Sequence, residues 1–302
     1  MAGGKDNTVT IDADSAGQRF DKFLIRLFPA GGKGFVYKML RKKRVKLNGE
    51  RAQGNEILNE GDAVTMYISP ETRAELAGNK DIKPSGTVLN ILYEDGDVLV
   101  VNKPANCLTH PDLVNAARGR SSGGFNPVAV NRLDRNTTGI VIIAKTLPAA
   151  QELSRAIRER LIEKTYLAAV SGVITKPAVL KGFAVKDRET NKTGFDARGK
   201  EAVTEIEPIF NNNEITVLKI NLVTGRSHQI RAHLQSIGKP VIGDPKYGDA
   251  AVNRKYGAKS QLLHAWKVRF SGLTGRLEYL NGKEISCEPE NAPDVIMNMN
   301  GD

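Results

Sequence analysis

The sequence is poor in the residues that crosslink small proteins or hold metals. Among its 302 residues there are two cysteines, Cys107 and Cys287, which lie far apart. This usage argues against a disulfide framework and fits a reducing cytosol. There are four histidines, and the nearest two, His228 and His233, are five residues apart, which is not the i, i+4 spacing that places two metal ligands on one helical face. We therefore expect no metal site and no cofactor.

Long apolar runs are missing as well. No stretch approaches the roughly 20 apolar residues that span a bilayer. The N-terminal residues 1–7 are polar and do not lead into the apolar stretch of a leader peptide. We expect a soluble, cytoplasmic protein that has no membrane partner.

What the sequence does have is positive charge. Lys and Arg number 44 against 34 Asp and Glu, which gives a formal net charge of +10, and 40% of the residues are apolar, enough for a packed core. A basic soluble protein suggests a polyanionic partner, either nucleic acid or an anionic membrane surface. Many basic proteins bind neither, so charge alone leaves the partner open.

The first 70 residues have the pattern of a small α/β module. Apolar residues at helical spacing over 20–28 predict an amphipathic helix, which should end at Pro29. A second helix is expected over 35–40, and the Asn48–Gly49 pair predicts a hairpin turn. A further strand is expected over 63–68.

A dense basic cluster lies between the second helix and this hairpin. Runs of charge are most often a solvated face. These residues, however, come from a helix end and from the start of a hairpin, so they would converge on one surface. We favour contact with nucleic-acid phosphates for Lys38, Arg41, Lys42, Lys43, Arg44 and Lys46.

Three elements of this region recur in a known module. They are Arg-Phe-Asp-Lys-Phe-Leu at 19–24, Arg-Val-Lys-Leu-Asn-Gly at 44–49 and Glu-Gly-Asp at 60–62. In that order they resemble the small RNA-binding module first known from ribosomal protein S-four, and the match covers about residues 15–70. The resemblance implies that domain 1–70 binds RNA through its basic cluster.

A polar stretch over 71–86 is interpreted as a linker, which leaves 87–302 as a second, β-rich domain. The segment 140–144 is continuously apolar, typical of a buried central strand. One helix is expected to begin at Pro148 and another to cover 229–237, with Ile237 facing the core. Other strands are expected over 88–93, 98–101, 204–210 and 214–222.

Three segments of this domain are unusually polar for their expected settings. Asp134 is flanked by two arginines just before the buried strand, and such a group is most often a surface ion pair. Arg226 stands at a helix entrance, with His228 and Arg231 expected on the solvated face of that helix. Tyr166 begins an apolar strand, where a tyrosine is more often part of the core than catalytic.

The same segments carry a second, longer resemblance. Asn-Arg-Leu-Asp-Arg-Asn-Thr-Thr-Gly at 131–139, Lys-Thr-Tyr-Leu-Ala at 164–168 and Gly-Arg-Ser-His-Gln-Ile-Arg-Ala-His at 225–233 resemble, in order, three motifs of the RluA family of pseudouridine synthases. The likeness extends over nearly all of the chain after residue 87. The first motif departs from the family pattern at Asn131, Asn136 and Thr138, which leaves the subgroup, and hence the RNA position, open.

The resemblance implies a mixed α+β catalytic domain on a large, mainly antiparallel sheet, with the cleft across its middle. It implies an isomerase that converts uridine to pseudouridine in structured RNA. Asp134 would be the nucleophile, Arg226 its guanidinium partner and Tyr166 the ring that packs on the target base. Leu263 or Ile230 would form an apolar wall beside the uracil. Further RNA contacts are expected from Arg132, His228 and Arg231.

The resemblance also sets the expected partners. Large-subunit ribosomal RNA is the favoured substrate, transfer RNA is possible, no DNA partner is expected, and the protein should be a monomer. One alternative is a non-catalytic RNA-binding factor in ribosome assembly, against which the joint presence of Asp134, Tyr166 and Arg226 argues. The other is a hydrolase of nucleoside glycosidic bonds, which would not need an RNA-binding module.

Overall fold

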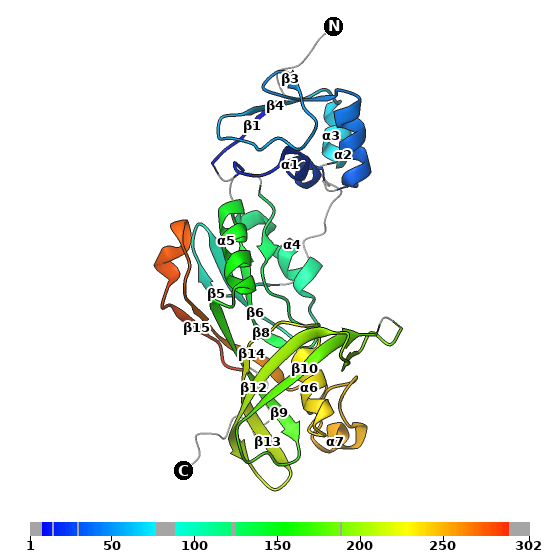
Figure 1. Ribbon diagram of the computed structural model, residues 1–302, viewed down its shortest axis with the longest axis vertical. Helices are drawn as coiled ribbons and strands as arrows, with labels where there is room; N and C mark the ends of the chain where they lie inside the picture. Colours follow the sequence, from blue (N-terminus) through cyan, green and yellow to red (C-terminus); the bar gives the residue numbers. More distant parts are fainter. Residues whose placement is uncertain are drawn as a thin grey trace. The chain divides into compact units, whose positions relative to one another are not determined.

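The computed structural model describes residues 8–13, 15–28, 30–76, 88–121, 125–187 and 189–289. Its contacts divide the chain into two compact units (Figure 1). The first comprises residues up to 87 with two short later segments, 115–127 and 145–148, and the second holds the rest. Within the described ranges, no helix is both long and apolar enough to cross a lipid bilayer.

In its described part before residue 77, the N-terminal unit combines short helices with a small sheet (Figure 1). The sheet is antiparallel throughout, with the strand order β1-β4-β2-β3. The helices are α1 (Phe20–Leu27), α2 (Gly32–Arg41) and α3 (Pro70–Leu76), and the strands are β1 (Thr8–Thr10), β2 (Val45–Leu47), β3 (Glu50–Arg51) and β4 (Ala63–Met66).

The core of this unit forms on the apolar stripe of α1. Phe20, Leu24 and Phe28 are fully buried, as their helical spacing predicts. They belong to one cluster with Val36 of α2 and Val64 of β4. Burying each such side chain contributes about 1.5–3 kcal/mol, so this cluster holds both helices on the sheet.

The expected hairpin turn is confirmed at Asn48 and Gly49. Both residues have positive φ, +52° and +81°, as a two-residue turn between antiparallel strands requires. The Asn48 side chain also donates to Asp62 at 2.8 Å and accepts from the Ala63 amide at 2.7 Å. The turn is thereby tied to the start of β4.

The first part of the expected linker is helical. Pro70 is the first residue of α3, and the Ser69 hydroxyl accepts from the Thr72 amide at 3.2 Å, which caps the helix. Leu76 packs against the N-terminal core. The stretch interpreted as a linker therefore begins with a helix, whose cap signal in the sequence was overlooked. The remainder of the expected linker, like Pro29, lies outside the described residues.

The second unit is built on one large mixed sheet, as predicted (Figure 1). Its main strand order is β11-β10-β12-β13-β9-β14-β8-β6-β5, with β7 added to β8 and β15 to β14. The β8–β14 pair is parallel, and the other pairs are antiparallel. The strands are β5 (Asn90–Glu94), β6 (Val98–Lys103), β7 (Val128–Ala129), β8 (Thr138–Ala144), β9 (Ile162–Ser171), β10 (Ala178–Lys186), β11 (Thr193–Phe195), β12 (Lys200–Asn211), β13 (Ile215–Leu222), β14 (Leu263–Phe270) and β15 (Glu284–Ser286).

Strand β8 is the buried central strand that the apolar run predicted. Residues 140–144 are all inaccessible to solvent. At its start, Gly139 has φ +105°, and a Cβ atom there would lie 2.2 Å from the carbonyl oxygen of Ala265 on β14. Only glycine lets the two strands approach so closely, and this fixes where the chain enters the sheet from the preceding loop.

Two helices of this unit match their predicted positions closely, α5 (Leu147–Arg158) and α6 (Gln229–Ser236). The prediction for Ile237 was wrong, since it follows the helix and is 41% exposed. Ile230 and Leu234 are buried, as predicted, and Arg231 is buried with them. The remaining helical segments are η2 (Thr109–Leu113), α4 (Val114–Ala116), η3 (Arg118–Arg120), α7 (Ala250–Lys255) and η4 (Gly275–Leu280).

His233 fixes α6 to the sheet. Its ring stacks on Phe195 of β11 with centroids 4.3 Å apart, and its Nδ1 lies 2.8 Å from the Thr204 hydroxyl on β12. None of the described residues bonds its buried Nε2. Burial lowers the pKa of His233 from 6.5 to about 4, so the ring is neutral in the folded protein near pH 7.

This burial predicts a loss of stability in mild acid. Between pH 6.5 and 4, the unfolded chain binds a proton that the folded His233 excludes, so the free energy of unfolding falls as the pH falls. We expect this group to account for about 2 kcal/mol between pH 7 and pH 5. Urea unfolding of wild type and His233→Asn at both pH values measures it. An equal loss in the two proteins would contradict the assignment.

Candidate active site

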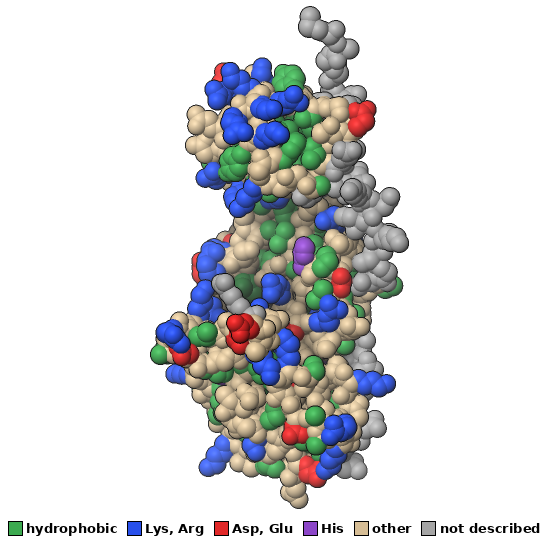
Figure 2. Space-filling model, turned by 90° about the vertical axis from the view of Figure 1, so that its right-hand side faces the viewer, with side chains coloured by type: hydrophobic (Ala, Val, Ile, Leu, Met, Phe, Trp, Pro, Cys, Tyr) green, Lys and Arg blue, Asp and Glu red, His purple; other side chains and the backbone are tan. Residues whose placement is uncertain are grey.

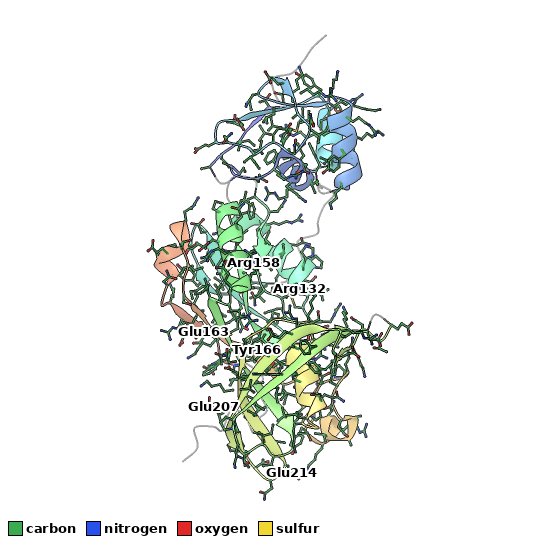
Figure 3. All side chains as sticks on the ribbon, in the orientation of Figure 1. Arg132, Arg158, Glu163, Tyr166, Glu207 and Glu214 are labelled. Carbon is green, nitrogen blue, oxygen red and sulfur yellow. The ribbon has the colours of Figure 1, made fainter. Side chains whose placement is uncertain are left out.

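A cleft of about 900 Å³ opens in the second unit, where the three polar segments meet. The loop before β8, the first half of β9 and the loop between β13 and α6 all contribute to its walls. Figure 3 shows Arg132 on the first of these elements and Tyr166 on the second. The structure thus brings together residues that lie far apart in the sequence.

Asp134 lies at the cleft and is held by an arginine of α6. Arg231 donates through Nη1 to Asp134 Oδ2 at 2.6 Å. The other carboxylate oxygen, Oδ1, is 3.9 Å from His228 Nε2. The Asp134 side chain is 29% exposed and the Arg231 side chain only 5%. Oδ2 is therefore fixed by the buried Arg231, while the Asp134 carboxylate remains open to the cleft.

Arg231 is in turn held by a second, fully buried carboxylate. Its Nε and Nη2 donate to the two oxygens of Asp244 at 2.6 and 2.8 Å. Asp244 also accepts from the amides of Lys246 and Tyr247. Burial opposes ionisation of Asp244, but the hydrogen bonds and charge of Arg231 outweigh it, so the pKa of Asp244 is lowered. The guanidinium is thus fixed by a two-pronged contact before it reaches Asp134.

The loop that carries Asp134 is supported by a buried ammonium group. Lys103 of β6 is inaccessible to solvent, and its Nζ donates to the carbonyls of Pro104, Cys107 and Arg135 at 2.8–2.9 Å. Burial lowers the pKa of Lys103 to about 8. Because Arg135 directly follows Asp134, this lysine fixes the backbone on one side of the carboxylate.

The other side of the loop is fixed by hydroxyl and amide side chains. The Leu133 amide donates to the Thr109 hydroxyl at 3.1 Å. Asn131 joins the loop to β8, because its side chain donates to the Ile140 carbonyl and accepts from the Ile142 amide. The loop is therefore held at both ends by groups that are themselves part of the sheet or packed on it.

Tyr166 of β9 faces the same space as Asp134. Its side chain is buried, and both residues border a small cavity at the bottom of the cleft together with Leu263 and Ile230. Burial, and next the negative charge of Asp134, raise the pKa of Tyr166. The hydroxyl therefore stays protonated, and the expected apolar residues lie where an aromatic base could pack.

His228 closes the cavity from the start of α6. It has φ +52°, and its Nδ1 lies 3.0 Å from the Tyr247 hydroxyl. Burial lowers its pKa, although the charge of Asp134 acts in the opposite direction. The unusual backbone turns this side chain toward the carboxylate, where it stands as a neutral ring near pH 7.

The predicted partner of Asp134 was wrong. Arg226 borders the cleft, but its Nε donates to the Glu201 carbonyl at 2.8 Å, and Arg231 holds the carboxylate instead. The cause is position on the helix: Arg226 lies before α6, whereas Arg231 lies within it on the buried side. For the same reason Arg231, predicted to contact RNA, has almost no accessible surface.

The other predicted RNA contacts divide between the two units. Arg132 is exposed at the edge of the cleft, and His228 lies inside it. The six basic residues 38–46 belong to the N-terminal unit, where all are exposed except the half-buried Lys46, whose Nζ lies 5.6 Å from the Tyr67 ring centre. Lys103 and Asp244 were given no role in the predictions from sequence. A charged side chain inside an apolar stretch was the available signal.

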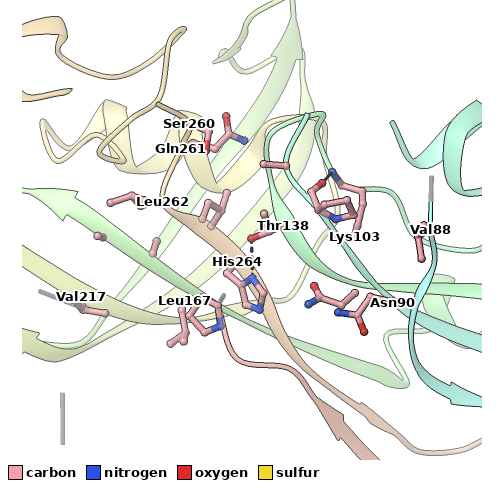
Figure 4. Close-up of a pocket in the computed structure, with 17 residues that line it drawn as sticks. Val88, Asn90, Lys103, Thr138, Leu167, Val217, Ser260, Gln261, Leu262 and His264 are labelled. Atoms are coloured by element: carbon pink, nitrogen blue, oxygen red, sulfur yellow. Dashed lines mark hydrogen bonds between the residues drawn. The ribbon is translucent and has the colours of Figure 1, made fainter. Parts of the chain in front are cut away.

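Another cavity, of about 390 Å³, is shown in Figure 4, and Asp134 is not among the residues that line it. It is lined by residues such as Thr138, His264 and Leu167. The Thr138 hydroxyl lies 2.7 Å from His264 Nδ1, and the Gln261 side chain donates to the Thr137 hydroxyl at 2.7 Å. These bonds join the end of the Asp134 loop to β14 and the residues before it.

Comparison with known proteins identifies the family. The family model described as RNA pseudouridylate synthase matches residues 97–236. An uncharacterized RNA pseudouridine synthase of Aquifex aeolicus is 36% identical over 76% of this chain and 77% of its own length. The ribosomal large subunit pseudouridine synthase C of Haemophilus ducreyi is 32% identical over 86% of each chain.

The chain belongs to the RluA-type pseudouridine synthase family. A solved structure of human RNA pseudouridylate synthase domain containing 4 shares the fold, with a TM-score of 0.57 and 21% identity over 70% of this chain and 93% of that one. This pseudouridine synthase is thus an isomerase that converts uridine in RNA to pseudouridine, as its motifs predicted.

The two arginines of this synthase should differ sharply when replaced. Arg231→Gln leaves the buried Asp244 without its partner, which should lower the free energy of unfolding by about 3–5 kcal/mol. It also frees Asp134, which should reduce kcat by about 100-fold or more. Arg226→Gln, the matched control, should change stability by less than about 1 kcal/mol. Urea unfolding and single-turnover kinetics test this, and equal destabilisation by both variants would contradict it.

Proposed function

We propose that this enzyme modifies uridines of large-subunit ribosomal RNA, with Asp134 as its nucleophile. The observation that carries the assignment is the Asp134–Arg231 pair at the edge of the cavity that Tyr166 borders. A carboxylate acts well as a nucleophile only when it is ionised and aimed. Arg231 orients the carboxylate by its hydrogen bond to Oδ2, and Oδ1 can then approach the sugar.

The chemistry asked of this site is an exchange of bonds within one nucleotide. The bond between N1 and C1′ breaks, the uracil turns, C5 bonds to C1′, the C5 proton leaves and N1 gains a proton. Asp134 would serve either by attacking C1′ or by removing a sugar proton on the way to a glycal. Both routes need the carboxylate beside the sugar, which is where a nucleotide flipped into this cleft would present it.

Tyr166 and the apolar residues would hold the base during this exchange. A flipped uracil loses its stacking partners, and an aromatic face offsets part of that loss. Leu263 and Ile230 border the same cavity as Tyr166. We assign Tyr166 to base contact and these two residues to the apolar wall, with His228 and Arg132 at the entrance.

We further propose that residues 1–70 form an S-four-type RNA-binding domain and that 87–302 form the catalytic domain. The connection between them, 71–86, begins with the rest of α3. On the face of the first unit that carries α2, Lys and Arg side chains gather (Figure 2). The exposed ring of Tyr67, which lies beside the half-buried Lys46, adds an aromatic surface to this cluster. Such a surface suits a phosphate backbone with unpaired bases nearby.

The choice of ribosomal RNA rests on the relatives. Several are named ribosomal large subunit pseudouridine synthases, including one from Xylella fastidiosa that is 32% identical over 88% of this chain. We place the enzyme in the cytoplasm, where bacterial ribosomes are assembled. We also propose that the enzyme acts as a monomer.

Replacing Asp134 should remove specific pseudouridines from cellular RNA. Cells that lack the gene would be complemented with wild type, Asp134→Ala or Asp134→Asn, and pseudouridine would be mapped in ribosomal and transfer RNA by chemical derivatisation. We expect one or more large-subunit sites to vanish and to return only with wild type.

Other outcomes of the mapping would redirect the assignment. Sites that vanish in transfer RNA alone would overturn the substrate proposal. Restoration by Asp134→Ala would overturn the nucleophile and favour a non-catalytic assembly factor. Release of free uracil from RNA in vitro would indicate a hydrolase, since isomerisation leaves the RNA mass unchanged.

Neutralising the N-terminal cluster should weaken RNA binding without harming the catalytic site. For Arg41→Gln combined with Lys42→Gln and Lys43→Gln, we expect the dissociation constant to rise, and the slope of log affinity against log salt to become shallower by up to about 3. Filter binding over a salt series measures both. A matched triple variant at Lys176, Lys181 and Lys219 controls for net charge, and an equal effect there would contradict a specific role.

A further inference from the structure

Lys164 is a cation placed deep in the catalytic cleft. It lies on β9, two residues before Tyr166. Alternate residues of a strand point to the same face, and both side chains border the cleft. Lys164 is half-buried, and Ile157 of α5 and Leu222 of β13 border the same cleft. Apolar groups therefore share this wall with an ammonium group.

This ammonium group has no acidic partner among the residues that the structure describes. Of the cleft carboxylates, Asp134 is already held by Arg231. The other charged residues of the cleft are basic, and they include Arg132, Lys186 and Lys246. Burial alone lowers the pKa of Lys164. A desolvated and unpaired cation is unfavourable unless an anion completes the site.

We propose that Lys164 binds a phosphate that flanks the target uridine. Neighbouring side chains on one strand face are about 6.5–7 Å apart along the strand, which is comparable to the distance between a base and the phosphate of its own nucleotide. With Tyr166 on the base, Lys164 therefore reaches the phosphate of that same residue. The inference rests on the catalytic assignment of this cleft.

This contact would position the nucleotide during the reaction. While the uracil is detached from C1′, the sugar is held through the RNA backbone and, on the route in which Asp134 attacks C1′, through that bond as well. A fixed phosphate on one side and Asp134 on the other keep C1′ in place as the base turns. Exposed cations such as Arg132 can bind phosphates farther along the RNA, but they do not lie beside Tyr166 on its strand.

The test pairs a change in the protein with a change in the RNA. Full-length wild type and Lys164→Met would act on an RNA stem-loop that carries the target uridine, with the flanking phosphate on the 5′ or the 3′ side replaced by an uncharged methylphosphonate. We expect Lys164→Met to lower kcat/KM by about 10- to 100-fold through KM. One of the two methylphosphonates should lower it similarly with wild type, and combining both changes should add little.

Two further variants separate charge from packing. Lys164→Arg keeps the charge and should restore most of the activity, whereas Lys219→Met removes an exposed lysine of β13 and should leave kcat/KM unchanged. The inference would be overturned if, for both methylphosphonates, the losses of kcat/KM from the RNA change and from Lys164→Met simply multiplied. A loss confined to kcat would also overturn it, since that would point to Lys164 as the base that removes the C5 proton.

The same combinations of Lys164→Met and methylphosphonate RNA can be compared in an Asp134→Ala background. Dissociation constants are then measured in place of rates, so the comparison does not depend on turnover. Failure of the proposed function would appear as wild type that makes no pseudouridine in the unmodified RNA. Failure of the Lys164 inference would leave that activity intact. It would appear only as RNA binding in which Lys164→Met and the methylphosphonates act independently.

Discussion

The structure of the catalytic cleft depends on one buried guanidinium. Arg231 joins Asp244, which has no accessible surface, to Asp134, which is open to the cleft. A charge that is desolvated on one side must be fully paired there, so Asp244 determines where Arg231 can point. Asp134 is in turn aligned by Arg231 as well as by the loop that carries it. The surrounding groups, Lys103 and His228 among them, hold the backbone and the cavity wall around this pair.

Much of the fold could be predicted because it follows from local patterns. The apolar run 140–144 could only be a buried strand, and the Asn48–Gly49 pair specified its turn through backbone conformation. Errors arose where a signal was weak or misjudged. The helix that begins at Pro70 was read as linker because its residues are polar, although Ser69 and Pro70 are typical helix-start residues. The side-by-side placement of β8 and β14 depends on contacts across more than 120 residues, which no local pattern encodes.

Most residues of the candidate site were predicted from the sequence, but the ion pairs and hydrogen bonds between them were not. Asp134 and Tyr166 were identified from motifs that resemble a family, and the structure places them at one cavity. The ion pair was assigned to Arg226 on the family resemblance, while Arg231 was expected on a solvated helix face. That expectation assumed that α6 has one buried side, whereas every residue from Gln229 to Leu234 is buried. Lys103 was overlooked because a lysine in an apolar strand gives no sign of which carbonyls it will bond.

The separation of Asp134 and Arg231 by 97 residues has a consequence for how the enzyme matures. A contact so distant in the chain forms only after the intervening strands have paired, and such closures are slow in folding. A partly folded chain, or one still being synthesised, therefore lacks an aligned carboxylate even when its first motif is complete. With Asp134 as the proposed nucleophile, the onset of catalysis would follow completion of the sheet that brings Arg231 to it.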